Sequence, residues 1–473
     1  MLRTMIRKEW QELTRDGRVR VLAGSILLLL GGALAASAVG VRQARSERSA
    51  AEALTRTHWV TQEAKNPHSA AHYGIYAFKP APVLSLIDNG VDPFAGQLTW
   101  LEAHKQNEFK ARPAQDALPL ARLGALGAST VLQLLVPLLI IVVAFAAFAG
   151  ERESGTMRQL LALGVAPRTL AMGKALGVST VLLAVLLPAT VLGVLAVVQA
   201  EGAGAVAADA PRAVTLGIVY LLFFVVWIAV SLGVSARART ARSALVSLLG
   251  VWMVTGLLAP RVASDLSRRM VQAPSAYEFA TAIANDFSKG IDGHNPADAR
   301  AKALEARVLK QYGVDSLSQL PVNFAGIALH AGEAYGDSVY DRRFNELWSA
   351  YERQEQVRTG VAVVAPVLAV RALSMGMAGT DVAQYRRFTD AAEQYRRQFV
   401  YAMNEDMTQN AGEADFEYKA SQALWTKVPP FSYAAPNLGW VLGQQRGALL
   451  VLLAWVVVSL GWAVTGVRRL SPL

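Results

Sequence analysis

The chain has 473 residues, of which 53% are hydrophobic and only 17% are charged. Soluble globular proteins usually carry about 25% charged residues, so this composition favours a membrane protein. The net charge is +10, which fits contact with anionic membrane lipid. The basic residues do not form a patch interleaved with aromatic residues, and this argues against a nucleic-acid partner. The absence of cysteine excludes disulfides and thiolate chemistry, and it fits a bacterium better than a eukaryotic secretory route.

The first 20 residues, MLRTMIRKEWQELTRDGRVR, predict an amphipathic helix on the membrane surface, because apolar side chains lie among charges as in interfacial helices. The residues that we assign to this helix are Lys8, Glu9, Trp10, Arg15 and Asp16. The apolar run that follows is longer than the core of a signal peptide, and no clear cleavage site follows it. We therefore expect this run to be the first membrane span.

Six apolar stretches are long enough to cross a bilayer, which needs about 20 residues per helix. They predict an all-α membrane protein with six transmembrane helices, at residues 21–41, 124–149, 175–199, 213–235, 243–263 and 446–466. None has a charged residue in its central part. Ion-coupled transporters usually need such groups in the membrane, so this pattern argues against one and against an intramembrane metalloprotease.

Basic residues predict the orientation of these spans. Several Lys or Arg residues occur in each of the segments 1–20, 150–174, 236–242 and 467–473. The short loop 200–212 carries only Arg212. By the positive-inside rule both termini and the block 150–174 are cytoplasmic. Six spans also require both termini to lie on one side of the membrane, so the number of spans and the charges agree. We expect a multi-pass protein of a bacterial inner membrane with two extracytoplasmic segments, 42–123 and 264–445.

The second extracytoplasmic segment, 264–445, predicts a mostly helical domain. Apolar or aromatic residues recur every three or four positions in 297–312, 341–358 and 381–407. The first segment is proline-rich and we expect it to be more irregular, and since both segments leave and re-enter the membrane they should pack together. Pro366 and Arg371 interrupt the apolar stretch 361–379, which we interpret as a helix near the outer membrane surface or buried in this domain, not as a seventh span.

All six histidines fall in the predicted extracytoplasmic segments. His68 and His72 have the i, i+4 spacing of two metal ligands on one helix face, but Ser69 stands where an H-E-x-x-H zinc site needs its glutamate. Solvated or structural roles account for them better, so we assign no metal and keep the pair as secondary candidates. Methionines at helical spacing usually fill a hydrophobic core. A copper site with soft thioether ligands is the alternative role for Met375, Met377, Met403 and Met407.

Motifs of the common catalytic sites are missing from the sequence. It contains no G-x-x-x-x-G-K-[ST] phosphate loop, no G-x-S-x-G elbow and no H-E-x-x-H pair. We therefore expect no catalytic residue and no cofactor on this chain. A membrane-anchored enzyme is the least favoured of three hypotheses, and energy for any transport has to come from another subunit.

The block 150–174, GERESGTMRQLLALGVAPRTLAMGK, predicts a helical hairpin at the cytoplasmic membrane face. Ser154 and Gly155 permit a change of chain direction. Gly164 is placed to end a short helix, and Pro167 suits the first turn of the next. From these residues alone, an ordinary solvated loop and a docking surface for a partner are equally open.

This block resembles the loop between spans two and three of ABC-2 type transporter permeases. The pattern E-R-E-x-G-T-x-x-x-L-L, a Pro-Arg step and a Gly-Lys pair falls on Glu151, Arg152, Glu153, Gly155, Thr156, Leu160, Leu161, Pro167, Arg168, Gly173 and Lys174. The N-terminal segment resembles the connecting helix of that family at Lys8, Glu9, Arg15 and Asp16. An S-x-x-x-A-G-T-D turn before a helix with Phe and Tyr-Arg resembles the DUF3526 subgroup at Ser374, Ala378, Gly379, Thr380, Asp381, Phe388, Tyr395 and Arg396.

The resemblance implies a non-enzymatic permease, an exporter, whose hairpin docks on a separate ATP-binding subunit. The docking residues that it implies are Glu151, Arg152, Glu153, Gly155, Thr156, Met157, Leu160 and Arg168. ATP and Mg would bind to two copies of that subunit, and a second permease chain, identical or homologous, would complete the complex.

The resemblance also leaves an alternative open. Some ABC-2 relatives are linked to copper-enzyme maturation, so the chain could transmit motion to a periplasmic protein without passing a solute. In the external domain Arg387 or Arg396 could bind an anionic ligand, although pairing with neighbouring acids is the favoured interpretation.

Overall fold

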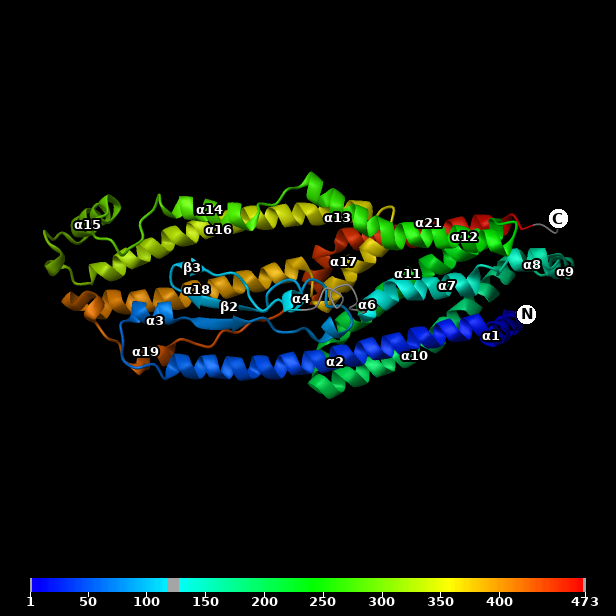
Figure 1. The fold of residues 1–473 in the computed structure, drawn as a ribbon, viewed down its shortest axis with the longest axis horizontal. Helices are drawn as coiled ribbons and strands as arrows, with labels where there is room; N and C mark the ends of the chain where they lie inside the picture. Colours follow the sequence, from blue (N-terminus) through cyan, green and yellow to red (C-terminus); the bar gives the residue numbers. More distant parts are fainter. Residues whose placement is uncertain (1, 117–126, 471–473) are drawn as a thin grey trace.

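The computed structural model describes residues 2–116 and 127–470 and shows a long, mostly helical molecule (Figure 1). Both termini lie at one end, together with α1 (Leu2–Arg15), α8 (Ala149–Glu153) and α9 (Thr156–Ala162), and we call this the hairpin end. The opposite part, formed by residues 61–116 and 271–437, is called the distal domain. Three parts of the chain lie outside the described residues, namely Met1, residues 117–126 and residues 471–473. The second of these is the predicted junction of the first external segment with span two.

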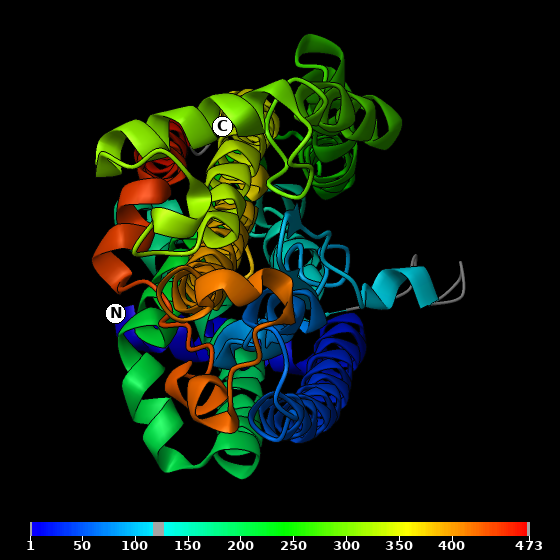
Figure 2. The ribbon, with the colours of Figure 1, turned by 90° about the vertical axis from the view of Figure 1, so that its left-hand side faces the viewer.

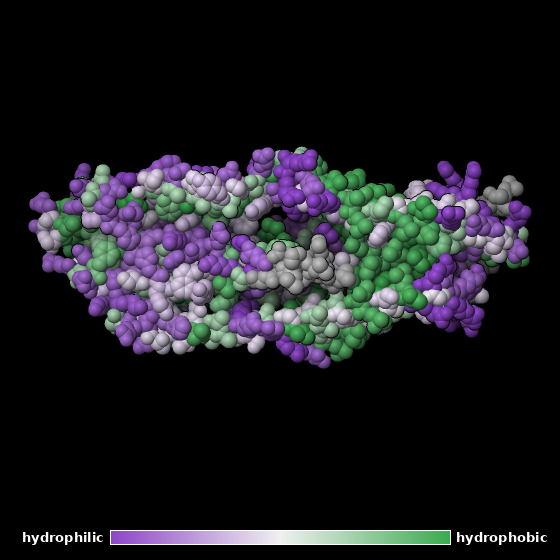
Figure 3. Space-filling model, in the orientation of Figure 1, coloured by the Kyte–Doolittle hydropathy of each residue, from purple (hydrophilic) through white to green (hydrophobic). Residues whose placement is uncertain are grey.

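Six helices in the described ranges are long and apolar enough to cross a membrane, namely Gly17–Val60, Ala128–Glu153, Pro167–Gln199, Ala207–Arg237, Ala241–Met270 and Arg446–Arg468. This confirms the predicted number of spans. On the face shown in Figure 3, their apolar side chains form a band between the polar hairpin end and the polar distal domain. The elements that build them are α2 (Gly17–Val60), α6 (Ala128–Thr130), α7 (Val136–Ala144), α10 (Pro167–Glu201), α11 (Ala203–Arg237), α12 (Ala241–Trp252), α13 (Ala259–Met270) and α21 (Arg446–Arg468).

The first spanning helix is far longer than a membrane requires. Helix α2 has 44 residues, which gives about 66 Å at 1.5 Å per residue against a hydrocarbon core of about 30 Å. Asp16 starts the helix by accepting the N–H of Arg18 at 2.8 Å. The predicted span 21–41 is therefore the first half of a continuous helix that reaches into the distal domain (Figure 1).

Two spans contain a π-helical turn, at Val131–Leu135 and Met253–Leu258. A π turn disturbs the regular backbone hydrogen bonds of a helix and leaves groups open to other partners. Here the indole N–H of Trp252, next to the second turn, donates to the carbonyl oxygen of Leu134 in the first at 3.0 Å. This bond joins the second span to the fifth.

The distal domain is mostly helical, as predicted. Its longer helices are α14 (Ala276–Phe287), α15 (Ala299–Tyr312), α16 (Phe324–Val361), α17 (Pro366–Ala378), α18 (Val382–Asn410) and α19 (Gln422–Lys427), with short 3₁₀ turns at Val83–Leu86, Leu317–Gln319 and Gly412–Glu417. Helix α20 (Leu438–Gln444) follows the distal domain and precedes the last span. Helix α17, within the stretch 361–379, is buried and packs against α11 and α21 without being one of the candidate spans.

The expectation of an all-α fold is wrong in one detail, because the first external segment contains a small sheet. Besides α3 (Pro67–Tyr73) and α4 (Pro113–Asp116), it forms β1 (Ile75–Phe78), β2 (Leu98–Glu102) and β3 (Lys105–Gln106) in an antiparallel order β1-β2-β3. Tyr76 pairs with Trp100 across the first two strands, and their rings lie 4.4 Å apart. Cross-strand aromatic pairs of this kind stabilise sheets.

The two external segments pack together, as expected. Figure 2 views the molecule from the distal end, where α3 of the first segment lies close to α18 and α18 lies against α16. The indole N–H of Trp59, at the end of α2, donates to the carbonyl oxygen of Trp425 at 2.9 Å, and the Trp59 ring packs edge-on against Phe399. Residues from the two segments therefore share one core.

Candidate functional site

The block between spans two and three is a compact helical hairpin. Gly155 has φ = 78°, the left-handed conformation that glycine adopts at little cost, and it turns the chain between α8 and α9. Gly164 also has a positive φ, and the bonds from Gly164 N to Leu161 O and from Val165 N to Leu160 O close α9 in a Schellman motif. Pro167 then opens α10. These positions confirm the predicted local structure.

A buried ion-pair cluster ties the hairpin to the N-terminal helix. The side chain of Lys174 on α10 is 3% exposed, and its Nζ lies 3.0 Å from Glu9 of α1 and 2.8 Å from Glu151 of α8. Lys8 lies 3.6 Å from the same Glu151 oxygen, so two cations face two carboxylates. We call these four residues the hairpin lock. It joins three helices through charges that compensate one another.

Small residues allow α1 to reach this position. A Cβ atom on Gly173 would lie 2.9 Å from the Cβ of Met5, and one on Gly177 would lie 2.5 Å from the Cβ of Glu9. Glycines spaced four apart form a flat helix face on which another helix can lie. The close crossing of α1 over α10 therefore depends on both glycines, and it brings Glu9 within reach of Lys174.

The other two charges of the E-R-E pattern also contact their own chain. Arg152 donates to the carbonyl oxygens of Ala236, at 2.9 Å, and Ala238, near the C-terminus of α11. Glu153 accepts the N–H of Ala241, in the first turn of α12, at 3.1 Å. A cation at a helix C-terminus and an anion at an N-terminus are both favourable placements. The pattern therefore braces the hairpin against spans four and five.

The outward face of the hairpin is made by other residues. Leu163, at the end of α9, is 78% exposed. Of the residues that the resemblance assigns to docking, Glu153, Gly155, Thr156 and Arg168 are exposed, Glu151, Arg152 and Leu160 are half-buried, and Met157 is buried. Leu163 is not among the docking residues that the resemblance assigns.

The residues predicted for the interfacial helix have divided roles. Glu9 is buried in the hairpin lock and Asp16 caps α2, so these two acids serve the chain itself. Trp10, Lys8 and Arg15 are exposed on α1. Contact of these three with lipid stays a prediction.

The DUF3526-like pattern forms a junction between the distal domain and the spans. Asp381 caps α18 by accepting the N–H of Gln384 at 2.8 Å. Ser374 donates to the carboxylate of Asp88 at 2.6 Å, and the hydroxyl of Tyr220 on α11 lies 2.9 Å from the Ser374 oxygen. A chain of buried hydrogen bonds therefore links the fourth span, α17 and the first external segment.

The structure brings His68 and His72 together with two histidines from distant parts of the sequence. His104 lies in the turn between β2 and β3, and His294 lies in the loop after α14. One ring nitrogen of each of the four lies within 4.8 Å of the others. The sequence offered no local spacing for the two additional residues; the confinement of histidine to the external segments was the only signal. We call these four residues the histidine cluster.

The charges around the histidine cluster are strongly shifted. Burial, together with the neighbouring rings, lowers the pKa of His68 to about 3, so this ring is neutral at pH 7. Burial alone would raise the pKa of Glu333, but the hydrogen bonds from His104 and the charges of His104 and Arg396 lower it to about 2. Arg396 is 1% exposed and pairs with Glu333, Glu393 and Asp337. These ion pairs agree with the favoured interpretation and leave no side for an anionic ligand on Arg396.

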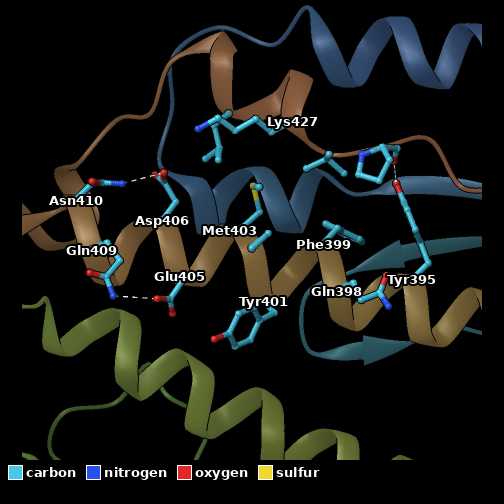
Figure 4. A pocket seen from close by; sticks show the side chains of 14 residues that line it. Tyr395, Gln398, Phe399, Tyr401, Met403, Glu405, Asp406, Gln409, Asn410 and Lys427 are labelled. Atoms are coloured by element: carbon cyan, nitrogen blue, oxygen red, sulfur yellow. Dashed lines mark hydrogen bonds between the residues drawn. The ribbon is translucent and has the colours of Figure 1, made fainter.

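The methionines and a groove beside α18 offer less chemistry than the histidine cluster. Met377, Met403 and Met407 lie in three separate apolar clusters, which fits core filling and not a shared copper site. A groove of about 490 Å³ runs between α18 and α19 (Figure 4). The carboxylates that line it, Glu405 and Asp406, accept hydrogen bonds from amides one turn further along the same helix. The groove therefore has an apolar floor and no convergent polar group among its lining residues.

Comparison with protein-family models gives two matches. Residues 102–259, which include spans two to four, the hairpin and most of span five, match the model described as ABC-2 family transporter protein. Residues 276–434 match the model described as domain of unknown function DUF3526. A search of curated proteins finds no match. The chain therefore carries an ABC-2 family transporter membrane domain followed by a DUF3526 domain.

Proposed function

We propose that this chain is the permease subunit of an ABC exporter in a bacterial inner membrane, with both termini and the hairpin in the cytoplasm. ABC-2 permeases generally pair with ABC ATPase subunits. In this proposal two such subunits bind ATP and Mg²⁺ and dock on the α8–α9 hairpins of two permease chains, which are identical or homologous. The clustering of basic residues at the hairpin end supports this orientation.

The hairpin lock is the observation that carries the proposal. A lever transmits force only if it is fixed to the elements that it moves. The hairpin is held to α1 and α10 by Lys174, and to α11 and α12 by Arg152 and Glu153, while Leu163 points outward. Displacement of the hairpin by an ATPase would therefore move several spans together.

The junction around Ser374 supplies a route from the spans to the distal domain. At the hairpin end, the Ser235 hydroxyl of α11 accepts the N–H groups of Phe148, at 2.9 Å, and Ala149, at 3.2 Å. Further along α11, Tyr220 contacts Ser374. Helix α11 is hydrogen-bonded to the start of the hairpin and to α17. A tilt of α11 would therefore move the hairpin end and the distal domain together.

The docking surface can be tested without disturbing the hairpin lock. Leu163→Glu should abolish co-purification of the ATPase subunit and reduce ATP-dependent transport in proteoliposomes at least tenfold, because it places a charge on the exposed apolar contact. The melting temperature of the isolated chain should not change. The matched control is Leu317→Glu, at an exposed leucine of the distal domain, 41% exposed. Equal co-purification of the ATPase with both variants would contradict docking at this surface.

Helix α2 favours a second candidate function, transmission of motion without passage of a solute. Since it runs unbroken from the hairpin end to Trp59 in the distal core, a tilt of its first half would move the distal domain directly. The chain contains no cysteine, so spin labels can be placed at two introduced cysteines without background. ATP-dependent distance changes between Leu54 and Tyr312 positions, with no solute movement in vesicles, would favour this function over export.

A further inference from the structure

The four rings of the histidine cluster come closer than unrelated histidines do. The Nε2 atom of His68 lies 3.1 Å from the Nε2 of His294 and 3.1 Å from the Nε2 of His104. His72, one helical turn after His68, packs its ring 4.8 Å from the ring of His68 and 5.1 Å from that of His104. Three chain segments, α3, the β2–β3 turn and the loop after α14, thus direct imidazoles at one point.

Hydrogen bonds fix which nitrogen of each ring carries the hydrogen. The Nδ1 of His68 lies 2.9 Å from the amide oxygen of Asn404, and the Nδ1 of His104 lies 2.8 Å from Glu333 Oε1. Amide and carboxylate oxygens only accept, so each Nδ1 must donate. In the neutral rings both Nε2 atoms then carry a bare lone pair.

The loop that carries His294 completes the arrangement. Its Nδ1 lies 3.1 Å from the carbonyl oxygen of Asp292, again an acceptor only. The loop lies directly on α16: a Cβ on Gly293 would meet the Ala328 oxygen at 2.6 Å, and one on Gly332 would meet the Asp292 oxygen at 2.6 Å. Only glycine permits this contact, which presses His294 towards the other rings.

In the neutral rings these three nitrogens, two of which lie 3.1 Å from that of His68, cannot hydrogen-bond to one another. A cation placed between them would accept all three lone pairs. Tetrahedral zinc with Zn–N bonds of about 2.0–2.1 Å places its ligand nitrogens about 3.4 Å apart, close to the separations found here. We propose that His68, His72, His104 and His294 bind one divalent transition-metal ion of the zinc type in the distal domain.

Ligand chemistry selects the class of metal. Imidazole suits borderline ions such as Zn²⁺, Cu²⁺ and Ni²⁺, whereas Mg²⁺ and Ca²⁺ require oxygen ligands. The oxygens of Asn404, Glu333 and Asp292 contact the far nitrogens of the rings, as outer-shell partners of metal-bound histidines usually do. The site is therefore built in two layers and discriminates against hard cations.

Charge and access also suit a metal cation. Glu333 belongs to an ion-pair network in which four carboxylates face two guanidinium groups, formed by Glu333, Asp337, Asp341, Glu393, Arg396 and Arg397. The excess of negative charge offsets the two positive charges of the ion. His68 is buried, while His72 and His294 are exposed, so the ion can enter from solvent on one side.

The bound ion would join the two halves of the distal domain. His68, His72 and His104 belong to the first external segment, whereas His294 belongs to the DUF3526 domain. Occupancy would therefore fix the loop after α14 to α3 and to the small sheet. This goes beyond the proposed transport function and does not depend on it.

The test is a Zn²⁺ titration of the full-length chain in detergent, purified through a tag without histidine and stripped with EDTA. In competition with a chromophoric chelator, the wild type should bind one Zn²⁺ per chain. His294→Ala and His72→Ala should each lower the affinity by more than about 100-fold, beyond the 10–100-fold typical of outer-shell changes. Both residues are exposed, so the variants should fold, which circular dichroism checks.

The matched control is His58→Ala, an exposed histidine on α2 outside the histidine cluster, whose Zn²⁺ affinity should equal that of the wild type. Substitution with Co²⁺ reports the geometry, since a tetrahedral site absorbs visible light far more strongly than an octahedral one. Substoichiometric binding by the wild type, or wild-type affinity in the folded His294→Ala and His72→Ala variants, overturns the proposal.

Discussion

The hairpin lock and the histidine cluster lie at opposite ends of the molecule. They differ in whether their polar atoms find partners within the chain. In the hairpin lock, Lys174 donates to two carboxylates and every charge has a partner from the same chain. In the histidine cluster, hydrogen bonds on the outer side of the rings leave the inner nitrogens facing one another without a donor.

This contrast separates structural from ligand-binding polar groups. Buried polar atoms in native proteins almost always find partners, and those that the chain does not supply come from water, ions or ligands. A cluster whose charges cancel fixes the packing of helices, as at the hairpin end. A cluster of uniform acceptors has instead to be completed from outside the chain.

The largest expected effect comes from removing the central charge of the hairpin lock. Lys174→Met leaves Glu9 and Glu151 buried beside each other, and breaking a buried ion pair in this way typically costs about 3–5 kcal/mol. We expect a strongly lowered melting temperature in detergent, followed by intrinsic fluorescence. Lys8→Met is the matched control, since its side chain is 49% exposed and an exposed pair is worth at most about 1 kcal/mol.

Replacing Lys174 together with both of its carboxylate partners sharpens the same comparison. Lys174→Met combined with Glu9→Gln and Glu151→Gln removes the three less exposed charges of the hairpin lock and leaves only the exposed Lys8, and such neutral replacements are often tolerated. The triple variant should therefore be more stable than Lys174→Met alone. Similar melting temperatures for Lys174→Met and Lys8→Met would show that the lock contributes little to folding.

The sequence predicts the hairpin well because its signals are local. Gly164 and Pro167 end and begin helices through their own backbone preferences, and these act within a few residues. The six spans follow from apolar runs in the same way. Local rules do not reveal which residue a charge contacts, so the inward direction of Glu151, towards a lysine 23 residues away, was not predicted.

The histidine cluster was beyond sequence reasoning for a related reason. His68 and His72 share one helix and could be paired by spacing, but His294 joins them across 226 residues through the packing of a loop on α16. No periodicity records such a contact. The small sheet was missed similarly, since four-residue strands between prolines give little pattern, and a partner strand is needed to see Tyr76 opposite Trp100.

The network behind the histidine cluster should show itself in the pH dependence of stability. Burial raises the pKa of Asp337 to about 6, and repulsion from Glu393 and Glu333 acts in the same direction. Attraction to Arg396 and Arg397 lowers the pKa but does not cancel the effect of burial. The folded state thus holds the proton more tightly than the unfolded state. The stabilising contribution is full below the unfolded pKa and is lost as the pH rises through about 6.

Asp337→Asn removes this titration while keeping an oxygen that can accept from Arg396. As the pH rises from 4 to 6, the free energy of unfolding of the variant should increase relative to that of the wild type. The increase is up to about 3 kcal/mol for a shift of about two pKa units. Melting temperatures of both proteins across this range measure the difference. A constant difference across the range would show that Asp337 has an ordinary pKa. The hairpin lock offers the comparison, since Lys174→Arg should follow the wild-type profile.

Two glycine substitutions test whether the hairpin lock and the histidine cluster act independently, and we expect their effects to be the smallest. Gly177→Ala forces α1 away from α10, and overpacking of this kind costs about 1–3 kcal/mol. Gly332→Ala instead pushes the loop with His294 outward. We expect the first to lower the melting temperature and leave Zn²⁺ affinity unchanged, and the second to weaken Zn²⁺ binding and leave ATPase co-purification unchanged. Gly217→Ala, with open space around it, is the control for both. If each variant altered both readouts equally, the two clusters would not be independent. The distinction between a structural hairpin lock and a ligand-binding histidine cluster would then be wrong.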